Sequence, residues 1–384
     1  MRKISLYEIA LSDRCNFNCS YCYIKKKNTV EMNNRTLEKL IEWIKKTHGK
    51  RFMLKFSYGE PLLSFEQIKK IVSLLEIDDD YRKTIITTNG SLISNKKISW
   101  MKDHNIHLQV SIDGDKFSNR LRINPNKWKR IVKKAKAAAK ELNLAIFYSI
   151  HPDNVCKMNI GFKTLVNNGF DKIILGLVDF GIPLLENGRI HEYISGFYEN
   201  FFWACKNYFL GKKIVMNLPR FFNFFIEDNL IGFNSKKEIK QRCGAMVWSC
   251  FVSPTGYIYP CPYFFSKYEN IFSMGNVFTG INNQQRIHWL NKTKTTNLKF
   301  LTKNSPEKLR KLSDTENDAL FHEFCPFLSF EQTKTLTSVS DKHVELILAL
   351  LRSVKELKQN LSISRLERDR LKKYAKFCLY SLAK

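Results

Sequence analysis

The hydrophobic positions in the first half of the chain follow two alternating periodicities. Short runs of apolar and β-branched residues are followed by longer stretches in which apolar residues recur every three or four positions. The first pattern predicts strands at 4–11, 52–57, 84–88, 107–112, 144–150 and 172–178, and the second predicts helices at 36–47, 65–75, 95–103, 127–142 and 158–168. Alternation of this kind gives parallel strands with right-handed crossovers. The sequence therefore predicts an α/β fold in which six units form a partial (β/α)6 TIM-like barrel.

The pattern changes after the sixth predicted strand. Residues 181–240 are aromatic and helical in pattern, and we expect Phe221, Phe222, Phe224 and Phe225 to lie in a core. The turn signal Thr255-Gly256 predicts a hairpin, and the polar residues 291–317 predict a surface loop. Two amphipathic helices are predicted at the C-terminus, with apolar faces at Val344, Ile347, Leu351, Val354 and Leu361 and at Leu371, Tyr374, Cys378 and Leu382.

These patterns predict four parts of the chain. A barrel domain at 1–185 is followed by a helical connector at 186–240, a hairpin domain at 241–330 and C-terminal helices at 331–384. The special residues of the barrel are expected at the carboxyl ends of its strands, where barrels of this kind place their chemistry.

Charge and cysteine content constrain the class of protein. Lysine and arginine number 63 against 36 acidic residues, a net charge of +27. This charge fits a polyanionic partner, either nucleic acid or an acidic peptide, but lysines scattered over solvated faces explain it as well. We favour scattered lysines, because no basic block is long or alternates with aromatic residues. The ten cysteines come without a secretory signal or an apolar segment that could span a membrane. We therefore expect a cytoplasmic protein whose clustered thiols bind metal.

Three cysteines share one short loop directly after the first predicted strand. The run Ser12-Asp-Arg-Cys15-Asn-Phe-Asn-Cys19-Ser-Tyr-Cys22 has the spacing C-x3-C-x2-C. A [4Fe–4S] cluster takes four ligands, so three protein thiolates leave one iron open for another molecule. A zinc site would normally require a fourth Cys or His nearby, and this loop has none. The loop predicts a three-cysteine iron–sulfur site, with zinc as the alternative.

The triad, with Tyr21 before its last cysteine, resembles the signature of the radical S-adenosylmethionine (SAM) superfamily. Three more motifs follow in the family's order, each at the end of a predicted strand: Ser57-Tyr-Gly-Glu-Pro61, Thr87-Thr-Asn-Gly90 and Ser111-Ile-Asp-Gly114. The resemblance covers about residues 5–180. It implies a [4Fe–4S] cluster on Cys15, Cys19 and Cys22 with SAM at the open iron.

The resemblance also implies which residues bind SAM. Gly59 and Glu60 would hold the amino group of the methionyl moiety, while Ser111 and Asp113 would face its ribose and methionyl end. The implied cofactor-binding set is Gly59, Glu60, Asn89, Ser111, Asp113 and Arg122, with Arg120 as the alternative partner for the methionyl carboxylate. Tyr58 departs from the family pattern, which usually has glycine there. The departure affects the backbone geometry expected at that position and not the role of the Glu60 carboxylate.

Downstream cysteines resemble the SPASM or twitch extension of many radical SAM enzymes. The pattern of this extension is a cysteine, a gap of 9–15 residues and then Gly-x4-Cys. This sequence fits it with Cys243, a gap of twelve residues and Gly256-x4-Cys261. The resemblance implies that Cys243, Cys250, Cys261 and Cys325 bind one auxiliary [4Fe–4S] cluster; a zinc site or an empty site is the alternative. The remaining cysteines, Cys156, Cys205 and Cys378, are expected to be inert core residues.

Members with this extension most often modify peptides or proteins. The resemblance therefore implies cleavage of SAM to a 5′-deoxyadenosyl radical that abstracts a hydrogen from a peptide or protein, with an external electron donor of the flavodoxin or ferredoxin type. Pro262 stands where sulfatase-type maturases carry an aspartate, which counts against that assignment. The first predicted strand starts within five residues of Met1, so we expect no N-terminal peptide-recognition domain.

Three strand-end residues, Asp179, Tyr58 and His151, are candidates for contact with the substrate. Two alternatives stay open. One is a radical SAM enzyme that acts on RNA or a small molecule, and the other is a non-catalytic iron–sulfur or zinc protein that binds a partner.

Overall fold

A computed structural model describes residues 3–24, 30–217, 244–269, 271–294, 341–360 and 364–383, together with Phe327, Glu331 and Lys334. The chain divides into two compact units. The first comprises Met1–Ser111, Leu121–Leu144 and Cys243–Lys292, and the second comprises Ile112–Arg120, Ala145–Arg242 and Thr293–Lys384. Among the described residues, no helix is long and apolar enough to cross a membrane.

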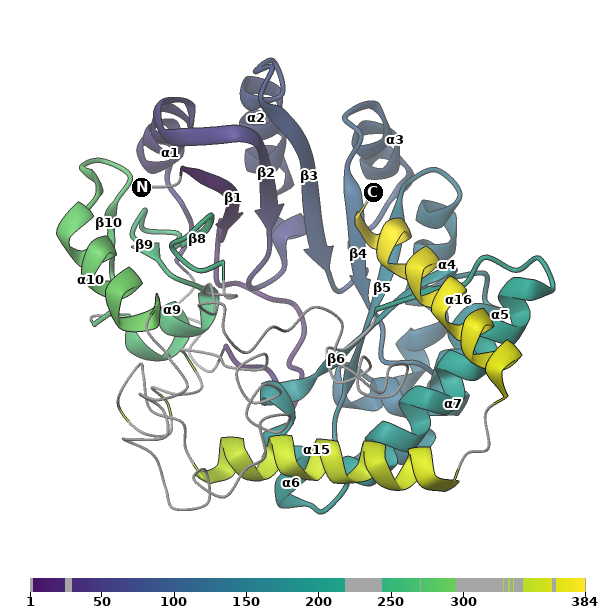
Figure 1. The fold of residues 1–384 in the computed structure, drawn as a ribbon. Coiled ribbons are helices and arrows are strands. Elements are labelled where there is room, and N and C mark those ends of the chain that lie inside the picture. The colour runs from purple at the N-terminus through teal and green to yellow at the C-terminus, as the bar shows by residue number, and fades with distance from the viewer. Residues whose placement is uncertain are drawn as a thin grey trace. The chain divides into compact units, whose positions relative to one another are not determined.

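The first unit is built on a mostly parallel sheet (Figure 1). Its strands follow the order β4 (His107–Ser111), β3 (Tyr81–Thr88), β2 (His48–Phe56), β1 (Ile4–Ile9), β8 (Ser249–Val252) and β9 (Ile258–Tyr259). Neighbouring strands pair in parallel, except that β8 and β9 form an antiparallel hairpin. A second antiparallel pair, β10 (Gly275–Asn276) and β11 (Gly280–Ile281), follows the hairpin. The hairpin predicted around Thr255-Gly256 is confirmed.

Helices connect the parallel strands of this unit. They are α1 (Asn34–Thr47), α2 (Phe65–Leu75), α3 (Asn95–Asp103) and α4 (Trp128–Ala139), and α9 (Pro262–Tyr268) and α10 (Asn283–Lys294) follow the hairpin. The side chain of Asn33 starts α1 by accepting a hydrogen bond from the Thr36 amide at 2.8 Å. Leu37, Leu40 and Ile44 then form the buried stripe of this helix.

The second unit contains the parallel strands β5 (Leu144–Ile150), β6 (Lys172–Leu177) and β7 (Val215–Met216). Its helices are α5 (Met158–Asn167), α6 (Ile182–Glu186), α7 (Ile190–Phe209), α15 (Asp341–Asn360) and α16 (Arg365–Ala383). Both C-terminal helices pack on α7, and the Tyr374 hydroxyl of α16 donates a hydrogen bond to the Ile214 carbonyl at 2.8 Å. The two predicted amphipathic helices are confirmed, because Val344, Val354 and Leu371 are buried.

The predicted α/β fold is confirmed, and within the described strands no closed barrel is formed. Two strands begin earlier than predicted, β2 at His48 and β3 at Tyr81. In β2 the register shifts next to Arg51, which has a φ of 59°, so the bulge interrupts the alternation that marks a strand. The loop predicted at 291–317 is wrong at its start, because α10 continues to Lys294. The aromatic group at 221–225 lies outside the described residues.

Candidate active site

The three predicted cluster cysteines lie in one loop that follows β1. Cys15, Cys19 and Cys22 are all partly exposed. The amide of Phe17 donates to the Cys15 sulfur at 3.4 Å, and the amide of Cys22 donates to the Cys19 carbonyl at 3.1 Å. The loop therefore turns back on itself at the end of the strand and keeps its sulfur atoms near the protein surface.

The spacing of the three thiols can be compared with the spacing that a zinc ion requires. In tetrahedral zinc sites with Zn–S bonds of about 2.3 Å, neighbouring sulfur atoms lie about 3.8 Å apart. In the described part of the chain, the three cysteines do not form a group whose ligand atoms all lie within 4.8 Å of one another. The three sulfur atoms therefore do not have the compact arrangement of a zinc site.

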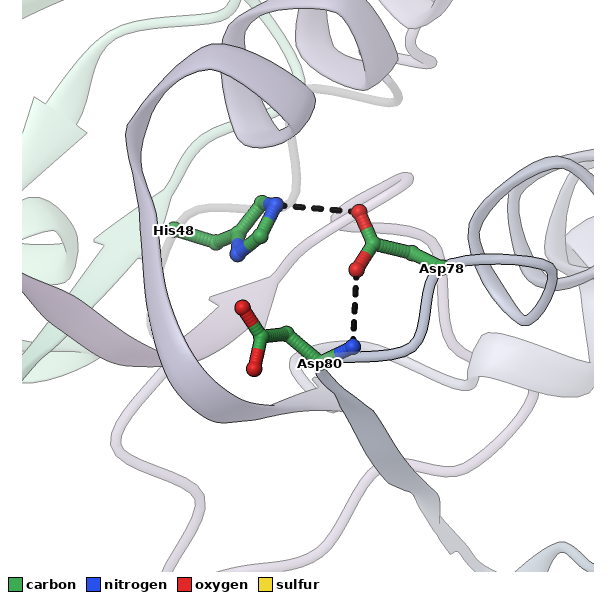
Figure 2. A group of neighbouring side chains, drawn as sticks. All are labelled: His48, Asp78 and Asp80. Carbon is green, nitrogen blue, oxygen red and sulfur yellow. Dashed lines mark hydrogen bonds and ion pairs between the residues drawn. The ribbon is translucent and has the colours of Figure 1, made fainter.

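A compact group of ligand-type side chains does occur elsewhere, at the start of β2 (Figure 2). His48, Asp78 and Asp80 place their ligand atoms within 4.8 Å of one another. The His48 Nε2 lies 3.0 Å from an Asp78 oxygen, and the second Asp78 oxygen accepts the Asp80 amide at 2.8 Å. These contacts tie the loop before β3 to the first residue of β2, which explains the group without a metal ion.

The loop between β2 and α2 packs directly on the backbone of the cysteine loop. The Glu60 amide donates a hydrogen bond to the Arg14 carbonyl at 2.8 Å. Gly59 has a φ of 61°, and a Cβ built there would lie 2.5 Å from the Arg14 oxygen and 2.9 Å from the Ser12 oxygen. A side chain cannot fit in that space, so the glycine is what allows the two loops to meet.

Glu60 is buried, and donors of the chain itself occupy its carboxylate. It is 2 % exposed and accepts hydrogen bonds from the Thr88 hydroxyl at 2.6 Å, the Asn89 amide at 2.8 Å and the Leu62 amide at 3.1 Å. Burial raises the pKa of Glu60, and the three hydrogen bonds oppose part of that rise. In this geometry Glu60 positions the end of β3 against the β2–α2 loop.

Asn89 connects the end of β3 to the cysteine loop. Its Nδ2 donates to the Asn16 side chain at 2.8 Å and lies 3.9 Å from the Cys15 sulfur. Asn16 in turn donates to the Ser91 hydroxyl at 2.8 Å. Sequence reasoning missed Asn16 and Thr88, because their roles depend on partners more than 25 residues away.

The structure distinguishes the two candidate arginines. The Arg122 guanidinium lies 5.3 Å from the centre of the Tyr21 ring, directly beside the cysteine loop. Arg120 belongs to the second unit and stacks on Phe117 at 3.8 Å. Ser111 ends β4 and is partly exposed. Within the first unit, Gly59, Glu60, Asn89 and Arg122 therefore contact the cysteine loop or the loop packed on it.

Tyr58 adopts the backbone conformation of a glycine. Its φ is 73°, a left-handed value that costs about 1–2 kcal/mol for an ordinary residue. The ring is 7 % exposed and lies 5.3 Å from Phe265, 5.5 Å from Phe251 and 6.0 Å from Tyr23, measured between ring centres. Burial raises the pKa of Tyr58 to about 12, so the phenol is neutral at physiological pH. The ring thus links the loop before Gly59 to the β8–β9 hairpin and α9.

We expect Tyr58→Gly to lower the free energy of unfolding by about 1–4 kcal/mol. Removing a large buried ring lowers the stability by about 3–5 kcal/mol. Relief of the strained φ offsets only about 1–2 kcal/mol of this loss. Urea denaturation of the metal-free protein measures the change. Tyr58→Phe keeps the ring and serves as the control. A glycine variant at least as stable as the wild type would show that strain outweighs packing at this position.

Asp113 lies in the second unit and is completely buried. Its carboxylate accepts the Ser149 amide at 2.9 Å, while its own amide donates to the Asn119 side chain at 3.0 Å. These bonds join the end of β5 to the loop at 113–119. Asp113 is therefore engaged inside this unit, and its predicted contact with SAM stays a prediction.

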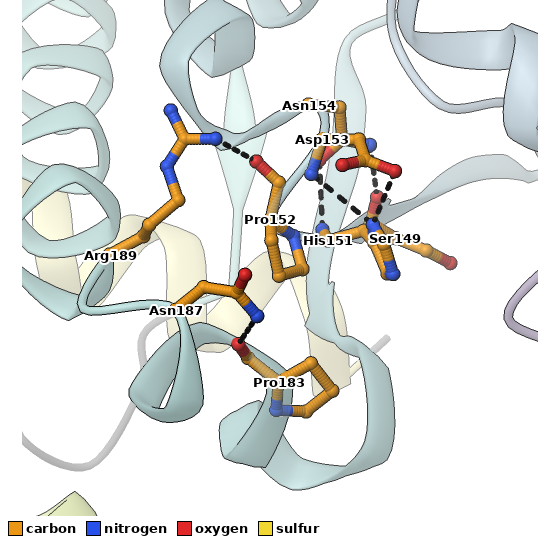
Figure 3. Close-up of polar contacts among 8 residues, drawn as sticks. All are labelled: Ser149, His151, Pro152, Asp153, Asn154, Pro183, Asn187 and Arg189. Carbon is orange, nitrogen blue, oxygen red and sulfur yellow. Dashed lines mark hydrogen bonds and ion pairs between the residues drawn. The ribbon is translucent and has the colours of Figure 1, made fainter.

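His151 and Asp179 follow β5 and β6 in the second unit. Asn154 fixes the turn after β5, because its side chain accepts the His151 amide at 2.8 Å and donates to the Ser149 carbonyl at 2.9 Å (Figure 3). The His151 Nδ1 lies 3.5 Å from an Asp153 oxygen. Asp179 is exposed and has a φ of 42°, so the backbone bends sharply where β6 ends. The roles predicted for His151 and Asp179 stay predictions.

The described auxiliary cysteines differ in environment. Cys250 lies in β8, is 2 % exposed and pairs in register with Tyr7 of β1; burial raises the pKa of its thiol. Its neighbour Phe251 packs in a cluster with Tyr58 and Tyr259. Because side chains alternate along a strand, Cys250 faces the opposite side of the sheet. Cys261 is partly exposed at the start of α9. Cys243 and Cys325 lie outside the described residues, and the auxiliary cluster stays a prediction.

The prediction for the remaining cysteines is confirmed for two and wrong for one. Cys205 and Cys378 are buried, and burial raises the pKa of Cys205 to about 11. Cys156 is exposed, because it lies in a short 3₁₀ turn between β5 and α5 and not on a buried helix face.

Residues 9–157 match the Radical SAM superfamily. The match spans the cysteine loop and the three motif-bearing loops described above, so the chain carries a radical SAM domain, and the predicted resemblance is confirmed.

Relatives with this domain include proteins of different activities. An uncharacterized protein of Methanocaldococcus jannaschii is 34 % identical over 30 % of this chain and 40 % of its own length. The radical SAM cyclopropyl synthase TigE of Paramaledivibacter caminithermalis is 27 % identical over 31 % of this chain and 29 % of its own. A probable GTP 3′,8-cyclase of M. jannaschii is 26 % identical over 68 % of this chain and 85 % of its own. The chain thus spans less than half the length of the first two relatives.

Solved structures share the fold over most of the chain. The structure of anSMEcpe with bound AdoMet aligns with a TM-score of 0.66 at 14 % identity, over 97 % of this chain and 98 % of that one. Streptococcus suis SuiB bound to the precursor peptide SuiA aligns with a TM-score of 0.56 at 15 % identity, over 89 % and 76 %. Both similarities concern the fold.

Proposed function

We propose that this protein is a radical SAM enzyme that modifies a peptide or protein. The observation that carries the proposal is the contact of three loops at the ends of β1, β2 and β3: Gly59 lies against the cysteine loop, and Asn89 reaches the Cys15 sulfur. Cys15, Cys19 and Cys22 would hold the cubane, since their sulfur atoms lack the compact arrangement of a zinc site. When bound, such a cluster supplies an electron that cleaves SAM to methionine and a 5′-deoxyadenosyl radical.

The residues around the loop would bind and orient SAM. Gly59 leaves space where the backbone of two loops meets, and the Arg122 guanidinium carries the positive charge that suits a carboxylate. Glu60 acts by holding the β3 end in place, since its oxygens are occupied by donors of the chain. Asn89, Ser111 and Asp113 complete the proposed SAM-binding set, in which Asp113 would act by fixing its loop.

Peptide substrates are favoured by the hairpin region that follows the barrel strands. The chain has the β8–β9 hairpin and α9, with Cys261 at the start of that helix, and the similar SuiB structure contains a precursor peptide. Cys243, Cys250, Cys261 and Cys325 would bind one auxiliary [4Fe–4S] cluster, with Cys250 the least accessible of the described members. An external flavodoxin- or ferredoxin-type donor would supply the electron.

The specific alternative is a nucleotide substrate, because relatives include GTP 3′,8-cyclases. Reconstituted enzyme, dithionite and SAM should be incubated with GTP, and the nucleotide followed by chromatography. We expect GTP to be recovered unchanged and the formation of 5′-deoxyadenosine to be no faster than without GTP. Conversion of GTP to a new nucleotide would contradict the peptide assignment and leave the SAM chemistry intact.

A further inference from the structure

The first unit contains a cavity that lies away from the cysteine loop. It is a cavity of about 560 Å³ between α1 and the β10–β11 segment, a size typical of ligand sites. Lys3 and Ile4, at the start of β1, form part of its lining, whereas the cysteine loop follows the end of that strand. Six strand residues at about 3.3 Å each separate the two by about 20 Å. We call this hollow the basic cavity.

The basic cavity carries an excess of positive charge. Its lining contains four cations, Lys3, Lys39, Lys46 and Arg286, and one carboxylate, Glu42. Glu42 lies 2.7 Å from the Lys39 ammonium, which neutralises it. Arg286 is 7 % exposed and donates to the carbonyls of Met246 and Val247, which are neutral acceptors. With four cations and one carboxylate, which is paired with Lys39, the lining keeps a net positive charge to which Lys3 and Lys46 contribute.

The cavity also has an apolar wall. Trp43 and Phe278 both line it. The Trp43 indole is 5 % exposed, and its N–H has no acceptor among the described residues. Because this N–H is inaccessible, Trp43 contributes apolar surface to the cavity and no hydrogen bond to a ligand.

We propose that the basic cavity binds a carboxylate-rich segment of the peptide substrate, remote from the residue that is modified. The proposal rests on the proposed function and extends it. The cavity could hold only a few residues, and the rest of the peptide would span the distance of about 20 Å to the cysteine loop. The net charge of +27 on the whole chain would attract such a segment from solution.

The lining favours carboxylates over nucleic acid. Single-stranded nucleic acid binds extended basic grooves in which bases stack on open aromatic faces. Here Trp43 is buried, and one face of the Phe278 ring has the Arg35 guanidinium 5.5 Å from its centre, although Phe278 is 43 % exposed. Arg286, the group best suited to a bidentate phosphate contact, already donates to two carbonyls. The lysines act as point charges, which suits carboxylates along an extended chain.

Fluorescence anisotropy with a fluorescein-labelled hexaglutamate peptide tests the proposal on the full-length protein. We expect binding that weakens with ionic strength, and a loss of about tenfold or more in affinity in a Lys3→Gln, Lys46→Gln double variant, which leaves the Lys39–Glu42 pair intact. The control is Lys129→Gln, Lys133→Gln, which removes the same charge from exposed positions on α4 outside the cavity. Its affinity should change by less than about twofold.

Three results would overturn the proposal: no binding of hexaglutamate, equal loss in both double variants, or displacement of the peptide by tRNA with the same dependence on Lys3 and Lys46. Cleavage of SAM by the cavity variant is measured in parallel. If the cavity variant cleaves SAM normally and binds the peptide as the wild type does, the cavity is not the peptide site, and the proposed function is unaffected. If the wild-type protein does not cleave SAM, the proposed function is wrong, whether or not the peptide binds.

Discussion

Gly59→Ala is expected to separate the two loops that form the proposed SAM site. The new Cβ would lie 2.5 Å and 2.9 Å from two backbone oxygens of the cysteine loop, at Arg14 and Ser12. Because both are backbone atoms, neither can rotate away, and the hydrogen bond from Glu60 to Arg14 is lost as the loops part. Overpacking, a left-handed φ and one lost hydrogen bond together predict a destabilisation of about 3–6 kcal/mol. We also expect loss of the reconstituted cluster.

Gly188→Ala is the matched control for this variant. Gly188 has a φ of 65°, close to the 61° of Gly59, and nothing lies within 4 Å of a Cβ built there. It therefore bears the conformational penalty alone, about 1–2 kcal/mol. Urea denaturation and iron content after anaerobic reconstitution are measured for both variants. Equal effects of the two substitutions would show that contact between the loops is not what Gly59 provides.

A Cys15→Ala, Cys19→Ala, Cys22→Ala variant is expected to lose about four irons per chain relative to the wild type, because one cubane holds four. If the auxiliary cluster also forms, the wild type holds about eight irons and the variant about four. Iron and acid-labile sulfide are counted after anaerobic reconstitution. The reason is the geometry of the loop: these thiols are partly exposed and do not form the compact group of a zinc site.

Cys156→Ala is the control that shows whether removing any exposed thiol lowers the iron content. Cys156 is an exposed cysteine that belongs to no predicted ligand set, so its loss should leave the iron content unchanged. Retention of the full iron content by the triple variant would place the cluster on other cysteines. In that case the loop after β1 would not be the SAM-binding site.

The parallel fold and the cysteine loop were predictable because their signals are local. Alternating strand and helix periodicities mark each β/α unit, and C-x3-C-x2-C stands directly behind β1. The order of the strand-end motifs then places Gly59 and Asn89 near this loop, because parallel strands end at the same edge of a sheet. The structure confirms this for the first unit, where both residues contact the cysteine loop.

What the sequence could not show depends on long-range partners. Glu60 was predicted to contact SAM, but its three hydrogen bonds to Leu62, Thr88 and Asn89 could only be seen once β3 lay beside β2. Tyr58 could keep a glycine conformation only because Phe251 and Phe265, some 200 residues away, pack on its ring. Cys156 was expected in a core on composition alone, and the exposed turn that holds it has no distinct pattern.

The central claim is that the loop of Cys15, Cys19 and Cys22 generates a radical from SAM. Formation of 5′-deoxyadenosine after anaerobic reconstitution and reduction with dithionite tests it most directly. The wild-type protein should convert SAM to 5′-deoxyadenosine and methionine in equal amounts, and the triple alanine variant should form none. If the reduced wild-type protein carries a full cluster and forms no 5′-deoxyadenosine, the claim is wrong.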